Sequence, residues 1–99
     1  MKLTVKGSID LNKMIKKIVD QVTDDLQSEL KLKTPVDTGR ARDGWIKNKG
    51  RKVNTITNSV PYIEELDKGH SNQAPRGIVE PAIEKIKANA ASGKYKKRN

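Results

Sequence analysis

The strongest constraint in this sequence is an apolar stripe near its N-terminus. Between residues 11 and 32 the apolar side chains recur at intervals of three and four, at Leu11, Met14, Ile15, Ile18, Val19, Val22, Leu26 and Leu30. This spacing places them on one side of an α-helix, with charged residues flanking the stripe. Such a helix is about 33 Å long at ~1.5 Å per residue, which spans most of a domain of this size. Thr34 and Pro35 end it, because the residue before a proline avoids the α region.

The segments on either side of this helix predict a small antiparallel sheet. Residues 1–6 alternate between polar and apolar types, which is typical of a short edge strand. Residues 40–48 and 52–58 predict two further strands, joined by a hairpin turn at residues 48–51. This hairpin is polar, so we expect at most one of its faces to be buried.

Two helical segments follow the hairpin. Residues 61–66 predict a short helical turn, and a second helix begins at residue 78 or 79 with Pro81 in its first turn. The sequence therefore predicts an α+β fold, in which a small antiparallel sheet, made of the hairpin and the N-terminal strand, packs against one long and one shorter helix. We expect residues 1–93 to form a single domain and residues 94–99 to form a flexible basic tail.

The composition excludes several classes of protein. The chain has no cysteine, which rules out a disulfide scaffold, a thiolate metal site and a cysteine nucleophile. Hydrophobic types supply 33% of the residues and aromatic types only 3%, so the core is thin and partner surfaces are expected to complete it. No apolar run approaches the ~18 residues of a membrane span. We therefore expect a soluble, intracellular protein that contacts no membrane and is not an enzyme.

Motifs with catalytic associations have simpler interpretations in this chain. Asp37-Thr38-Gly39 is the tripeptide that each subunit of a retroviral aspartic protease supplies, but here it follows a long helix and a proline and precedes two arginines. A turn is the favoured interpretation, with the glycine free to adopt positive φ. His70 is the only histidine, and it lacks the neighbouring ligands that a metal site needs. We expect neither a metal nor a cofactor.

The net charge of +9 is unevenly distributed. Four cations lie in the last six residues, at Lys94, Lys96, Lys97 and Arg98. They form either a solvated end or a contact with DNA or another polyanion, and the sequence favours neither alternative. A second group surrounds the hairpin, at Arg40, Arg42, Lys47, Lys49, Arg51 and Lys52. Its charges either prevent edge-to-edge aggregation or face nucleic acid or an acidic partner subunit. Trp45 lies among them, and a core anchor is favoured over an interface anchor.

One extended pattern resembles a known family. The run Lys33-Thr34-Pro35-Val36-Asp37-Thr38-Gly39-Arg40-Ala41-Arg42-Asp43-Gly44-Trp45 follows the long helix, and Asn58-Ser59-Val60-Pro61, Tyr62, Glu64 or Glu65, Gly69, Pro75 and Ala82 follow it in order. This pattern resembles the head–tail joining proteins of tailed bacteriophages, also called tail-completion or neck proteins. The resemblance covers about residues 10–90. It departs from the family at Ala41, where an aliphatic residue such as leucine is more usual, and at Asp67, where an aromatic residue often stands.

The resemblance implies a structural role in the virion. It implies a ring, of six subunits, at the junction of the tail tube and the head connector, assembled in the host cytoplasm and crossed by DNA. The implied partners are copies of the chain, the head connector or adaptor, the tail tube protein and, transiently, DNA. The candidate interface residues are Asp37, Thr38, Arg40, Arg42, Trp45, Arg51, Lys52 and Tyr62. A tail terminator, or a small basic DNA- or RNA-binding module, remains as an alternative.

Overall fold

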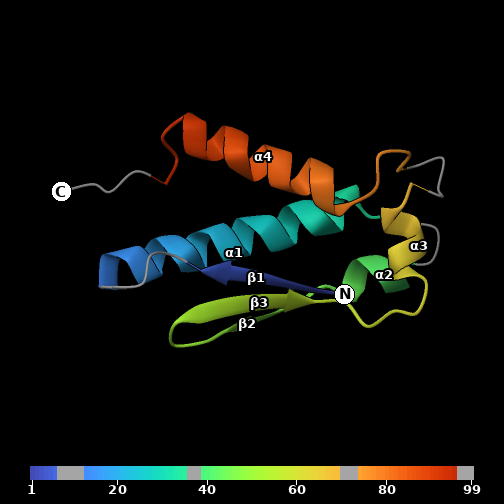
Figure 1. Cartoon of the computed structure of the whole chain (residues 1–99), viewed down its shortest axis with the longest axis horizontal. Helices are drawn as coiled ribbons and strands as arrows, with labels where there is room; N and C mark the ends of the chain where they lie inside the picture. Colours follow the sequence, from blue (N-terminus) through green and yellow to red (C-terminus); the bar gives the residue numbers. More distant parts are fainter. Residues whose placement is uncertain (7–12, 36–38, 70–73, 96–99) are drawn as a thin grey trace.

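The structure is a computed structural model, which describes residues 1–6, 13–35, 39–69 and 74–95. Its elements, in chain order, are β1 (Lys2–Lys6), α1 (Lys13–Lys33), α2 (Arg40–Asp43), β2 (Ile46–Lys49), β3 (Val53–Thr57), α3 (Ile63–Asp67) and α4 (Val79–Ala91). The molecule is elongated, with principal extents of 44 × 27 × 18 Å. Helix α1 runs along the long axis, with the sheet on one side and α4 on the other (Figure 1). The predicted α+β fold is confirmed.

The sheet has three antiparallel strands in the order β1-β3-β2. The N-terminal strand is therefore at an edge, as its alternation predicts. In the register, Ile56 of β3 lies between Leu3 of β1 and Lys47 of β2. Because side chains alternate along a strand, this row faces α1, and the rows on either side of it face away.

The long helix is confirmed, with Lys13–Lys33 as its described extent and the predicted stripe residue Leu11 outside the described residues. Val19, Leu26 and Leu30 of the stripe are buried. The helix ends where the sequence predicts, just before Pro35. At this end of the helix the Thr34 hydroxyl donates a hydrogen bond to the Leu30 carbonyl oxygen, at 2.6 Å.

The prediction of a strand over residues 40–48 is wrong in its first half, because Arg40–Asp43 forms the short helix α2. Gly39 has φ +70°, which turns the chain, and its carbonyl oxygen accepts a hydrogen bond from the Asp43 N–H at 2.9 Å. The Asn58 side-chain amide donates to the Ala41 carbonyl oxygen at 2.8 Å. Ala41 is thereby held in the core, and the hairpin strand starts only at Ile46.

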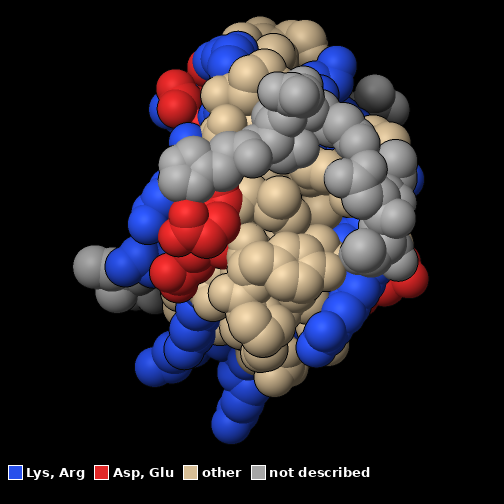
Figure 2. All heavy atoms as spheres, turned by 90° about the vertical axis from the view of Figure 1, so that its right-hand side faces the viewer, with Lys and Arg blue, Asp and Glu red and all other residues tan. Residues whose placement is uncertain are grey.

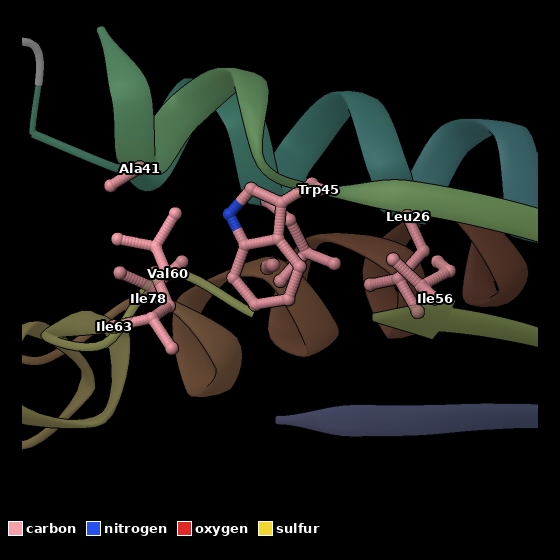
Figure 3. Packing of buried hydrophobic residues seen from close by; sticks show 9 residues of the cluster. Leu26, Ala41, Trp45, Ile56, Val60, Ile63 and Ile78 are labelled. Atoms are coloured by element: carbon pink, nitrogen blue, oxygen red, sulfur yellow. The ribbon is translucent and has the colours of Figure 1, made fainter. Parts of the chain in front are cut away.

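The core lies where α1, the sheet, α3 and the start of α4 meet (Figure 3). The indole ring of Trp45 is at its centre, 1% exposed, and its N–H donates to the Thr34 hydroxyl oxygen at 2.8 Å. Ile56, Ile63 and Ile78 pack into the same cluster. The core position favoured for Trp45 is confirmed.

The predicted helical turn and second helix are confirmed as α3 and α4, and one carboxylate joins them. Oδ1 of Asp67, the last residue of α3, accepts hydrogen bonds from the backbone N–H groups of Ile78 at 3.0 Å and Val79 at 2.8 Å. Asp67 thus caps a helix whose own N-cap residue supplies no side-chain bond. Gly77 has φ +85°, and a Cβ there would collide with the Asp67 carbonyl oxygen. The two segments therefore fit only with glycine at this position.

Candidate interaction surface

The two faces of the sheet differ sharply. One face is covered by α1. The other, which we call the outer sheet face, carries the side chains of Lys2, Thr4, Lys6, Ile46, Asn48, Val53, Thr55 and Thr57. Ile46 is 63% exposed and Val53 is 39% exposed, so two large hydrophobic side chains of this face meet solvent. In the described part of the chain, no acidic residue belongs to the outer sheet face.

Two of the predicted hairpin cations share one carboxylate on the face of the sheet that packs against α1. Lys47 Nζ lies 2.6 Å from Asp24 Oδ1 of α1, and Lys49 Nζ lies 3.1 Å from the same oxygen. The hydrogen bond from Lys47 is the main reason that the pKa of Asp24 lies below its ordinary value. These lysines attach the hairpin to α1, and Asp24 offsets only one of their two positive charges.

A buried amide fixes the hairpin turn against α1. Asn54 is fully buried, and its side-chain oxygen accepts hydrogen bonds from Lys16 Nζ at 3.0 Å and from the Gly50 N–H at 3.1 Å. Its amide nitrogen donates to Asp20 Oδ1 and to the Thr23 hydroxyl oxygen, both at 2.9 Å. The bond from Asn54 is the largest cause of the lowered pKa of Asp20. The tip of the hairpin is consequently held at a defined position alongside the N-terminal half of α1.

The remaining exposed cations of the sheet and its hairpin belong to the hairpin tip and to β1. Arg51 and Lys52 occupy the turn between β2 and β3, and both are exposed. Lys2 and Lys6 lie on the outer sheet face. These four residues form no ion pair within the described residues. The two tip residues are among the candidates predicted from the sequence, whereas the two lysines of β1 are not, although the alternation over residues 1–6 places both on one face.

The other candidate interface residues gather at the opposite end of the molecule, around α2 and α3. Arg40 is exposed, whereas Arg42 is half-buried and donates to the Thr34 carbonyl oxygen at 3.2 Å. Tyr62 is half-buried and immediately precedes α3, whose Glu64 is exposed. Figure 2 views this end of the molecule: uncharged residues form a broad area, bordered by acidic side chains on one side and by Lys and Arg side chains around it. Asp37 and Thr38 lie outside the described residues.

The start of the basic C-terminal segment is attached to α1. Lys94 Nζ lies 3.0 Å from Asp25 Oδ2, and the Tyr95 hydroxyl donates to the same oxygen at 2.8 Å. The hydrogen bond to Asp25 raises the pKa of Lys94, and burial raises the pKa of Tyr95. Lys94 therefore has an acidic partner within the chain, whereas Lys96, Lys97 and Arg98 lie outside the described residues.

The described residues contain no group of three or more His, Cys, Asp or Glu side chains placed to hold a metal ion. None of their helices combines the length and the apolar character needed to cross a bilayer.

Comparison with known proteins defines the class of this chain as a bacteriophage tail component. Residues 3–69, more than half of the chain, match the model of the HK97-gp10-like family, described as "Bacteriophage HK97-gp10, putative tail-component". The chain belongs to this family. The matched region begins inside β1 and ends just beyond α3, and so contains α1, the hairpin and all of the sheet except Lys2. No curated protein and no solved structure matched the chain.

Proposed function

We propose that this protein is a non-enzymatic tail-completion or neck protein, which forms a ring of six subunits where the tail tube meets the head connector. Its partners in this proposal are its own copies, the connector or adaptor, and the tail tube protein. Subunits assemble in the host cytoplasm, and DNA crosses the finished ring. The family of phage tail components supports the virion role.

The observation that carries the proposal is that the two faces of the sheet are packed unequally. Within the part of the chain that the structure describes, helices pack on one face of the sheet, and the other face leaves Ile46 and Val53 exposed. A domain with so few hydrophobic residues gains stability when neighbouring subunits cover such surface. In a ring, contacts repeated around a rotation axis cover this exposed surface in every subunit.

The proposed subunit contacts are the hairpin and the segment around α2. Arg51 and Lys52 contribute from the hairpin tip, and Arg40 and Tyr62 from the other end of the molecule. Arg42 and Trp45 act indirectly, because Arg42 is bonded to the Thr34 carbonyl and Trp45 is buried. Asp37 and Thr38 complete the proposed set.

The proposal is tested by deleting the gene from the phage that encodes this chain and examining the lysate by electron microscopy. A joining protein leaves full heads beside separate tails of normal length, and plasmid-supplied protein restores joined particles. Tails of uncontrolled length would instead support the tail terminator. Normal numbers of joined particles would refute both virion roles at the junction.

A small DNA- or RNA-binding module is the second candidate. It is favoured by the exposed cations of β1 and of the hairpin turn and, within the described residues, by the lack of acidic residues on the outer sheet face. Cations without acidic neighbours suit the phosphate backbone, and affinity then falls steeply with salt because counterions are released. Fluorescence anisotropy with a random-sequence duplex at several salt concentrations measures this. If the protein does not bind the duplex even at low salt, this candidate is eliminated.

A further inference from the structure

The outer sheet face has one end where an exposed hydrophobic side chain is surrounded by cations. Val53 is 39% exposed, and Lys6 lies directly opposite it on β1. Arg51 and Lys52 precede it in the turn. We call these four residues the basic tip. Asn54 joins the adjacent turn to α1, with one hydrogen bond from Gly50 of the turn and three to side chains of α1, so the basic tip is presented on a rigid support.

A surface of opposite character lies at the other end of the molecule. Glu64 and Glu65 are exposed on α3, and Glu65 shares an exposed ion pair with Lys68, at 3.5 Å. Pro61 is exposed and Tyr62 is half-buried just before this helix. Figure 2 shows acidic side chains beside a broad uncharged area at this end. We call residues 61–65 the α3 surface.

The basic tip and the α3 surface cannot meet within one chain. The hairpin turn and α3 lie at opposite ends of the molecule, whose longest extent is 44 Å (Figure 1). A contact between them therefore joins two copies head to tail. Each copy then retains one free surface of each kind, so the contact repeats, and it closes into a ring if the rotation between copies allows closure.

We propose that the basic tip of one copy docks on the α3 surface of the next. Arg51 and Lys52 face Glu64 and Glu65, and the uncharged area before α3 covers Val53. The two surfaces carry opposite charges, and each combines charged with uncharged residues. An exposed valine among the cations favours a protein partner over DNA, since phosphate contacts require only the charges. This proposal rests on the proposed ring and specifies its subunit contact.

Disulfide trapping tests the contact directly, because the natural chain has no cysteine. Phage are grown with the double variant Lys52→Cys/Glu64→Cys supplied in place of the natural chain, and purified particles are oxidised. Both positions are exposed, so the fold is expected to be retained. The proposal predicts a ladder of covalent multimers on non-reducing gels, whereas each single-cysteine variant gives no ladder. A double variant that enters particles but cross-links no more than the single variants would overturn it.

Charge exchange provides a second test. The variants Arg51→Glu/Lys52→Glu and Glu64→Lys/Glu65→Lys each place like charges across the contact, and each is expected to lower the yield of joined particles at least tenfold. Co-expression of the two restores the yield, since unlike variants then alternate around an even-membered ring with every contact complementary. A loss confined to the first variant, without rescue and with weaker duplex binding, would assign the basic tip to DNA and refute the self-contact.

Different results would refute the proposed virion role and the proposed subunit contact. Mass spectrometry of purified particles shows whether the natural chain is present in them. Its absence would refute the proposed virion role, whereas its presence together with no cross-linked ladder and no charge rescue would refute only this subunit contact.

Discussion

The capping of α4 by Asp67 makes the most specific prediction about stability. Asp67→Ala removes the acceptor of the Ile78 and Val79 N–H groups. Loss of a helix cap costs about 0.5–2 kcal/mol, and loss of a negative charge at a helix N-terminus costs about 0.3–1 kcal/mol more. Ile78 is fully buried, so water does not readily replace the carboxylate. We therefore expect a loss in unfolding free energy of about 2–3 kcal/mol, near the upper end of this range.

A matched variant separates the hydrogen bonds from the charge. Asp67→Asn keeps a side-chain oxygen as acceptor and removes only the charge, so the expected loss is about 0.3–1 kcal/mol. For a domain of this size 1 kcal/mol corresponds to a melting-temperature shift of about 4–8 °C, which makes the two variants distinguishable. Trp45 is the only tryptophan and is buried, so its fluorescence reports urea unfolding. Equal losses in the two variants, or a loss below about 0.5 kcal/mol in Asp67→Ala, would refute the capping argument.

Three further predictions follow from individual contacts. Thr34→Val leaves the buried Trp45 N–H without an acceptor and should cost about 1–3 kcal/mol in urea unfolding followed by circular dichroism; its cost should shrink when Trp45→Phe is already present, and strict additivity would contradict the bond. Ile56→Ala should cost about 2–5 kcal/mol, whereas Ile46→Ala on the exposed face should cost less than about 1 kcal/mol in the monomer, so similar losses would contradict the assigned register. The pKa of Asp24 is lowered in the folded state, so the stability it contributes is present above its ordinary pKa of 3.8 and is lost as the pH falls through the folded-state value. The midpoint of urea unfolding should therefore fall less steeply with decreasing pH in Asp24→Asn than in the natural chain. Identical curves of midpoint against pH would contradict the bonds to Lys47 and Lys49.

Local sequence signals predicted most of the elements because each element has a strong local cause. The stripe between residues 11 and 32 predicts α1, and Pro35 predicts its end. Alternation predicts β1, and Gly50 within a polar turn predicts the hairpin. These signals depend on neighbours within a few residues, so no knowledge of the tertiary fold is needed.

The segment over residues 40–43 shows where local signals are insufficient. Its residues do not prohibit a strand, and they become helical because Gly39 adopts positive φ and because Asn58, distant in sequence, donates to the Ala41 carbonyl. Arg40 and Arg42 are consequently on a helix rather than on one face of a strand. Asp67 shows the same limit: its departure from the family pattern was visible in the sequence, but its capping of α4 depends on a contact across a loop.

The sequence by itself determined the amphipathic α1, the small antiparallel sheet, the thin core and the excess of positive charge. Only the tertiary structure decided which of those charges are paired with acidic side chains. It pairs Lys47 and Lys49 with Asp24 and Lys94 with Asp25, and within the described residues it leaves the cations of the basic tip without an ion pair. The physical reason is that ion pairing depends on distances of a few ångströms between side chains far apart in the chain, whereas helix and strand formation depends on the order of adjacent residues.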